Sequence, residues 1–137
     1  MLRVTPDGKE LWVQTVGANT NVVLDAESMK VVHTEPTGHG PVTCAFAPAG
    51  GRYGLVTHLE EDFVLALDGE TGRTVQRIDV GGAQANVSFM PDGAIAYVAV
   101  TGRNEVVAID MGELAVVARI AVGEEPMGLV LLDPATA

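Results

Sequence analysis

The chain has 137 residues, of which 47% are hydrophobic and 19% charged, a length and balance typical of one folded globular domain. A net charge of −10, with only 8 scattered Lys and Arg, argues against nucleic acid and anionic membrane surfaces as partners. No apolar run reaches the roughly 18 residues of a membrane span, and the single cysteine, Cys44, excludes an intrachain disulfide.

Three residue types recur along the chain every 42 or 43 residues. The markers are four prolines, three aspartates and three glycines: Pro6, Pro48, Pro91, Pro134, Asp25, Asp68, Asp110, Gly38, Gly81 and Gly123. Because independent residue types keep one period, the pattern predicts internal repeats. They span approximately residues 6–47, 48–90 and 91–133 of a single domain, residues 1–137.

Each repeat begins with a turn, as in Pro6-Asp7-Gly8, where proline presets φ and glycine takes the strained position. The first predicted strands follow at residues 11–16, 53–58 and 96–101. A polar connection then carries Asn19, Asp62 or Asn104, residues that tolerate the left-handed conformation of a tight hairpin.

The second predicted strands, residues 21–25, 63–68 and 106–110, each end at a periodic aspartate, which we expect to cap the next turn with its side chain. The third lie at residues 30–35, 73–80 and 115–122, and the fourth at residues 42–47, 85–90 and 127–132. Four strands in about 42 residues are typical of a β-propeller blade. Residues 63–67 lack polar alternation, so both faces should be covered, whereas charged residues place residues 73–80 at the outer rim.

Residues 91–134 resemble a YVTN-type β-propeller repeat, a group related to lactonase-like and haem-binding nitrite-reductase propellers. The matching features are the Pro91-Asp92-Gly93 turn, Tyr97-Val98, Asn104, Ile109-Asp110, and Gly123 with Pro126. The resemblance covers nearly the whole chain, but the second repeat departs from it, with Ala49 in its turn and residues 58–61 in place of a small polar turn. It implies the fold and no single function, since members include surface-layer proteins, periplasmic binding proteins and propellers tied to quinone or haem enzymes.

In this family's arrangement the strand before the Pro-x-Gly turn is innermost in its blade. Two blades should then be complete, residues 41–80 and 84–122. Residues 11–35 would lack an inner strand, and residues 127–132 would be an inner strand without partners. The prediction is an all-β protein with about three blades of four antiparallel strands, two complete and one split. Three blades fall below the roughly four to eight of known propellers. Two alternatives stay open: a homodimer closed by strand exchange, or an open piece of a longer propeller.

The ligand-binding candidates lie in turns leading to inner strands: His39, Gln84, Asn86 and Pro126. His39 could be a haem or metal ligand, although a Gly-His pair is purely structural in WD-type repeats. Gln84 stands where most such repeats have proline, so its amide is expected to face the central channel.

A metal site is not predicted, although one short run contains potential ligands: His58, Glu60, Glu61 and Asp62. Calcium loops space their oxygens and turn at a glycine, so a solvated acidic hairpin is the favoured interpretation. No catalytic residue is expected, because nucleophile elbow, zinc-helix, phosphate-loop and haem-attachment motifs are all missing. Cys44 lies in an apolar run and is expected in the core.

The favoured hypothesis is a non-enzymatic binding or scaffold module that takes a protein partner or small ligand on the turn face around the channel. Part of an oxidoreductase-like propeller enzyme using haem or pyrroloquinoline quinone is one alternative, and a structural surface-layer repeat is another. No cofactor, nucleic acid or membrane insertion is predicted under the favoured hypothesis. The resemblance implies a periplasmic or extracellular location, although residues 1–10 lack the pattern of a signal peptide.

Overall fold

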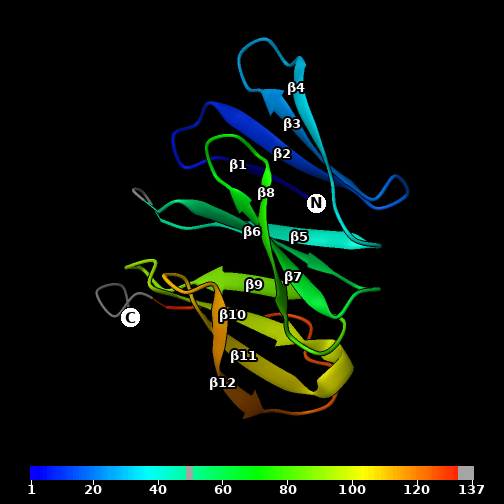
Figure 1. Ribbon diagram of the computed structural model, residues 1–137, viewed down its shortest axis with the longest axis vertical. Coiled ribbons are helices and arrows are strands. Elements are labelled where there is room, and N and C mark those ends of the chain that lie inside the picture. The colour runs from blue at the N-terminus through cyan, green and yellow to red at the C-terminus, as the bar shows by residue number, and fades with distance from the viewer. Residues whose placement is uncertain (49–50, 133–137) are drawn as a thin grey trace.

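The computed structural model describes residues 1–48 and 51–132, and these residues form three sheets stacked along the long axis of the molecule (Figure 1). Each sheet has four strands, and every strand pairing is antiparallel. The predicted all-β class and the four-stranded antiparallel units are therefore confirmed. Within the described ranges, no helix has the length and apolar character needed to cross a bilayer.

The strands of each sheet follow one another in chain order. The first sheet contains β1 (Leu2–Val4), β2 (Glu10–Thr15), β3 (Thr20–Asp25) and β4 (Val31–Pro36). The second contains β5 (Pro41–Phe46), β6 (Tyr53–His58), β7 (Phe63–Asp68) and β8 (Thr74–Asp79). The third contains β9 (Asn86–Phe89), β10 (Ile95–Val100), β11 (Glu105–Asp110) and β12 (Ala115–Ala121), with a short 3-10 helix, η1 (Thr101–Arg103), after β10.

The first sheet corrects the prediction that residues 11–35 lack an inner strand. Leu2 pairs with Val13 and Val4 pairs with Leu11, so β1 supplies that strand from the residues just before the first turn. A strand of only three residues leaves no recognisable pattern in the sequence. Residues 127–132 form no strand in the structure, because none of the described residues pairs with them. The chain therefore has three four-stranded sheets followed by an unpaired segment.

The Pro-Asp-Gly turns form as predicted in the first and third repeats. Gly8 and Gly93 have φ of 74° and 73°, in the left-handed region that glycine enters without steric cost. Residues 49 and 50 of the second repeat's turn and Pro134 lie outside the described residues.

The hairpin connections confirm the prediction for the two asparagines and correct it for the aspartate. Asn19 and Asn104 have φ of 56° and 57°, as the left-handed position requires. Asp62 has no positive φ. The β6–β7 connection that contains Asp62 is therefore built differently from its counterparts.

The periodic aspartates cap the turns that follow them, as the sequence predicts. Each side chain accepts a hydrogen bond from the backbone N–H three residues later: Asp25 from Ser28 at 2.7 Å, Asp68 from Thr71 at 2.9 Å and Asp110 from Glu113 at 2.9 Å. Such a side chain supplies a local partner to backbone groups that the strand ladder leaves unpaired.

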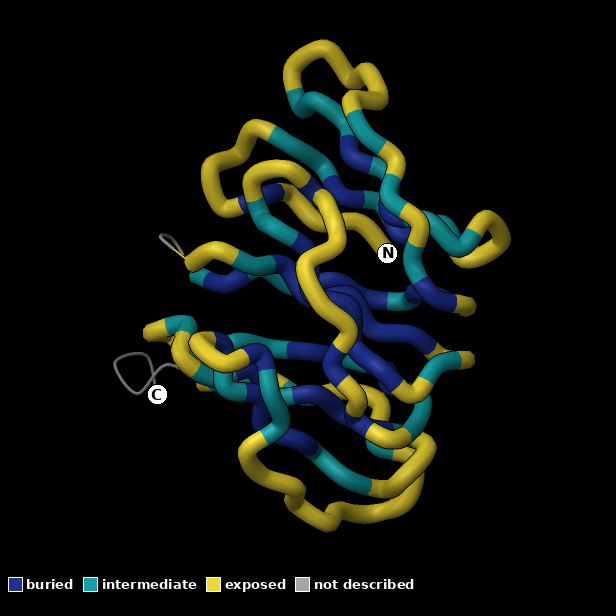
Figure 2. The backbone as a smooth tube through the Cα atoms, viewed as in Figure 1, coloured by how far each residue is buried: buried dark blue, intermediate teal, exposed yellow. Residues whose placement is uncertain are grey.

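Apolar side chains fill the two seams between the sheets. Between the first and second sheets Trp12 has no exposed surface, and its ring lies 4.7 Å from that of Phe46, edge to face. Cys44 is fully buried in the same core, as predicted, and this burial raises the pKa of its thiol to about 11. The middle strand β7 is buried over its apolar length, whereas β8 is largely exposed at the rim (Figure 2).

Candidate functional site

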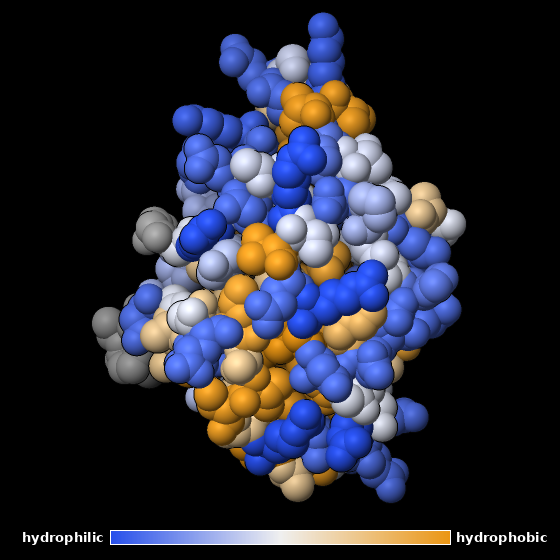
Figure 3. Space-filling model, viewed as in Figure 1, coloured by the Kyte–Doolittle hydropathy of each residue, from blue (hydrophilic) through white to orange (hydrophobic). Residues whose placement is uncertain are grey.

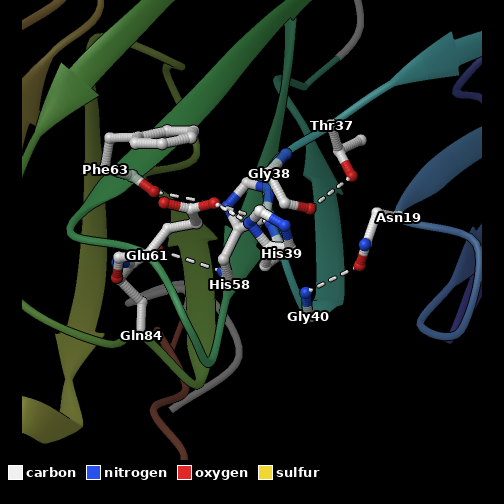
Figure 4. A network of polar contacts seen from close by, with 9 residues as sticks. All are labelled: Asn19, Thr37, Gly38, His39, Gly40, His58, Glu61, Phe63 and Gln84. Carbon is white, nitrogen blue, oxygen red and sulfur yellow. Dashed lines mark hydrogen bonds and ion pairs between the residues drawn. The ribbon is translucent and has the colours of Figure 1, made fainter.

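Three connections meet at one end of the stacked sheets (Figure 4). They are the β4–β5 connection (residues 37–40), the β6–β7 connection (residues 59–62) and the β8–β9 connection (residues 80–85). We call this end the network end. Hydrogen bonds join side chains and backbone from all three, so the structure brings together residues that are more than 40 positions apart in the sequence.

His39 and Glu61 form the exposed part of the network end. The Oε1 atom of Glu61 accepts a hydrogen bond from the backbone N–H of His39 at 2.7 Å and contacts His39 Nδ1 at 2.9 Å. The backbone and ring hydrogen bonds from His39 hold the pKa of the Glu61 carboxyl below its usual value, so the carboxylate is ionised at neutral pH. The His39 side chain is 71% exposed, and since Nδ1 is engaged, a ligand would meet Nε2.

His58 lies directly beneath this pair and has no exposed surface. The backbone N–H of Gly38 donates to its Nε2 at 3.2 Å, and because that group can only donate, Nε2 is the unprotonated ring nitrogen. Nδ1 then carries the proton and donates to the Phe63 carbonyl at 3.3 Å. Burial lowers the pKa of His58, so the ring is neutral, and both nitrogens are occupied by backbone groups.

Gln84 corrects the prediction that its amide faces the channel. The residue is fully buried, and its Oε1 accepts a hydrogen bond from the backbone N–H of His58 at 3.0 Å. Its Nε2 donates to the carbonyl of Glu61 at 2.8 Å and also to the carbonyl of Gly82. Gln84 therefore fastens the β6–β7 connection to the β8–β9 connection.

Gly38 has a steric role at this end of the sheets. A Cβ atom placed on Gly38 would lie 2.6 Å from Cγ of Glu61 and 2.7 Å from Cζ of Phe63. Only a residue without a side chain lets the β4–β5 connection approach this closely. Steric crowding thus explains why the periodic position is glycine at Gly38.

Two asparagines join connections in the same way in the first and third repeats. Asn19 Oδ1 accepts a hydrogen bond from the backbone N–H of Gly40 at 3.1 Å, and Asn104 Oδ1 accepts one from Glu125 at 3.0 Å. From the sequence, these residues were expected only to adopt the left-handed hairpin conformation. Their side-chain role could have been found from the equal separation, 21 residues, between each asparagine and its partner.

The other two ligand-binding candidates lie elsewhere. Asn86 opens β9, is half-buried and pairs with Ala99 of β10. Pro126 belongs to the third repeat's own connection, where its carbonyl accepts a hydrogen bond from the hydroxyl of Thr101 at 2.7 Å. The structure thus brings His39 and Gln84 to the same network, one exposed and one buried.

The four potential metal ligands do not converge. His58 turns inward to Gly38 and Phe63, while Glu61 turns to His39. In the described part of the chain, no group of three or more His, Cys, Asp or Glu side chains is placed to hold a metal ion. The surface is instead hollowed next to Glu61, the residue that contacts His39. The hollow has a volume of about 480 Å³ and is lined by Leu59, Glu60, Glu61, Asp62, Gly82 and Ala83.

Similarity to solved structures identifies the fold to which the three sheets belong. No family model and no curated protein matches the chain. A hydrazine synthase structure from Kuenenia stuttgartiensis matches 91% of the chain with 26% identity and a TM-score of 0.84. The WD40 repeats of RRP9 match 88% of it with 17% identity and a TM-score of 0.77.

The three sheets are blades of a β-propeller.

A third propeller-like match covers 93% of the chain with 21% identity and a TM-score of 0.79, and is the dihydro-heme d1 dehydrogenase NirN in complex with DHE. The chain spans 36% of the hydrazine synthase chain, 28% of the NirN chain and 37% of the RRP9 chain. The likeness therefore covers a propeller portion of larger proteins. The WD-like character expected of the repeats is supported at the level of the fold.

Proposed function

We propose that this propeller module is a non-enzymatic binding module with repeats of the YVTN type, and that its network end is the binding surface. The observation that carries the proposal is the exposed His39 ring fixed by the ionised Glu61 carboxylate. Beneath it, His58 and Gln84 satisfy their polar groups with backbone partners. Exposed polar groups held on a rigid base lose little entropy when a partner binds.

The charge beside His39 supports a cationic partner, such as a protein segment rich in lysine or arginine. Three acidic residues, Glu60, Glu61 and Asp62, are among those that line the hollow. The whole chain carries a net charge of −10. A surface of one sign attracts a partner of the other, mainly by accelerating the encounter.

The state of His58 supports binding over catalysis. A catalytic site needs titratable groups that converge where a substrate can reach them. The buried His58 ring is neutral and occupied by backbone at both nitrogens. At the network end the exposed His39 contacts the carboxylate of Glu61, an arrangement suited to electrostatic recognition.

A haem- or quinone-dependent enzyme portion is the second candidate, favoured by the likeness to hydrazine synthase and to NirN in complex with DHE. The residues at the network end fit a haem poorly, because the hollow next to Glu61 is lined in part by acidic residues, whose carboxylates repel anionic propionates. We therefore derive no step through haem or pyrroloquinoline quinone. A structural surface-layer repeat and an exported location also remain proposals.

Titration of the 15N-labelled chain with a ten-residue lysine-rich peptide, and separately with haemin, tests these functions. We expect the peptide to shift the amide signals of residues 38–40, 59–62 and 82–83, and haemin to leave them and its own Soret band unchanged. The Glu61→Gln variant should weaken peptide binding about 5-fold, since it removes a charge-assisted contact. Glu70→Gln is the matched control, because it removes one charge from an exposed residue of the β7–β8 turn, at the other end of the sheets.

Peptide binding that is equal in the two variants would mean that only net charge matters, and it would refute the network end as the site. A Soret shift abolished by His39→Ala would favour the haem-enzyme alternative. Binding of neither probe would favour the surface-layer alternative.

A further inference from the structure

One face of the first sheet is apolar and lacks the cover that the other sheets have. We call the face of a sheet toward the preceding sheet its leading face, and the opposite face its trailing face. Trp12 and Val23 lie on the trailing face of the first sheet, packed on the second sheet. Since side chains alternate along a strand, the neighbouring positions form the leading face: Leu2, Val4, Leu11, Val13, Val22 and Leu24.

The equivalent positions in the other two sheets show how far these side chains are buried when a neighbouring sheet covers the leading face. In the second sheet Val56, Leu65 and Leu67, and in the third sheet Val98, Val107 and Ile109, are the counterparts of Val13, Val22 and Leu24. None of the six counterparts is more than 2% exposed. In the first sheet the same positions are half-buried, and Leu2 and Val4 are 58% and 51% exposed. The residues are apolar in all three sheets, so only the neighbouring sheet differs.

The third sheet has the complementary deficit on its trailing side. Ile120 is 47% exposed, whereas its equivalent in the second sheet, Ile78, is 3% exposed. Val122 is 41% exposed, whereas its equivalent Val80 is fully buried. Figure 3 shows apolar residues gathered from the centre to the lower left of the viewed face, in the region of β8 and β12.

The unpaired segment, residues 127–132, lies in the repeat at the place of the inner strands β5 and β9. Leu129 and Leu131 are half-buried, whereas Met127, Val130 and Leu132 are 62%, 76% and 73% exposed. The segment therefore has the repeat position and the apolar character of an inner strand, but it pairs with none of the described residues.

We propose that a second copy of this chain covers these surfaces and closes a six-bladed ring. The leading face of each first sheet packs on the trailing face of the other copy's third sheet. The chain already makes this kind of leading-to-trailing seam twice, between its first and second and its second and third sheets. Three blades in each of two copies give six, within the range of about four to eight that closed propellers have, and a two-fold rotation closes the ring.

The inner edge of the first sheet decides how the two copies join. β1 pairs with only three residues of β2, whereas β5 pairs with five residues of β6. The partner's residues 127–132 are repeat-equivalent to β5. In the closed ring this segment lies along the free edge of β1, so that Leu2 and Val4 of β1 stay in the covered face.

Light scattering and sedimentation equilibrium on the full chain test the proposal. We expect a mass twice the 14.3 kDa of one chain. Ile120→Glu should raise the dimer dissociation constant by about 100-fold, because the charge would be buried at both seams of the ring. Since Ile120 is exposed in the single chain, the variant should keep its fold, which circular dichroism checks.

Val117→Glu is the matched control on the same strand. Val117 is 56% exposed, and its equivalent Val75 stays 42% exposed although the second sheet is covered on both faces. This position is therefore on the rim, outside the seam, and the control should dimerise like the unaltered chain. A mass of 14.3 kDa up to millimolar concentration, an assembly of another size, or equal effects of the two substitutions would each overturn the proposal.

Discussion

Replacing Gln84 by leucine removes three hydrogen bonds from the buried base of the network end while keeping the volume of the side chain nearly constant. The backbone N–H of His58 would lose its acceptor, and the carbonyls of Glu61 and Gly82 would each lose a donor. The change therefore isolates hydrogen bonding from packing.

The magnitude follows from the burial of each group. His58 is fully buried, so its unpaired N–H costs about 1–3 kcal/mol of folding free energy. The two carbonyls belong to connections that water reaches in part, so each loss costs about 0.5–1 kcal/mol. Their sum is about 3 kcal/mol, and with an m-value of about 1.5 kcal/mol/M the urea midpoint should fall by about 2 M.

Urea unfolding followed by the fluorescence of Trp12, the single tryptophan of the chain, measures this change at one fixed protein concentration. Gln76→Leu is the matched control, because Gln76 is exposed on β8 and its amide makes one hydrogen bond, to the Leu114 carbonyl at 3.1 Å. It should cost about 1 kcal/mol or less. Equal losses of unfolding free energy in the two variants would show that the hydrogen bonds of Gln84 do not stabilise the network end.

Two further predictions concern buried titratable groups. Because burial lowers the pKa of His58 in the folded chain, the unfolded chain binds its proton first as pH falls below about 6.5, and stability should drop by up to about 1.4 kcal/mol per pH unit. Urea midpoints between pH 7.5 and 5.5 should show a steeper loss in the unaltered chain than in His58→Thr, and parallel slopes would contradict the buried neutral ring. Cys44, whose thiol pKa is raised to about 11, should react with a disulfide reagent at pH 8 only after urea is added, since about one thiol in a thousand is ionised. Rapid labelling of the folded chain would show that the core between the first two sheets opens.

Repeat periodicity predicts the sheets well because it reports the turns and apolar runs that build them. Pro6, Asp25 and Gly8 each act locally, so their roles can be inferred from neighbouring residues. β1 was not predicted because a strand of three residues is too short to show an alternation of polar and apolar residues. Its position depends on pairing with β2, which no local pattern reports.

The candidate site was only partly predictable, because its geometry depends on residues from different repeats. Both His58 and Gln84 depart from their repeat equivalents, which are Thr15 and Val100 for the first and two prolines for the second. Each departure alone suggested a ligand. In the structure the two residues are joined by a hydrogen bond from the backbone N–H of His58 to Gln84 Oε1. The fact that both residues differ from the repeat pattern in the same part of the chain was the signal that could have shown that they interact.

The chain order of the strands within each sheet has a consequence for how the protein folds. Every strand pairing joins neighbours in the sequence, so each sheet can form from about 40 consecutive residues without waiting for distant ones. During synthesis the first sheet can assemble while the third is still being translated. Until another sheet covers it, the apolar leading face of the first sheet is a surface that a chaperone could bind.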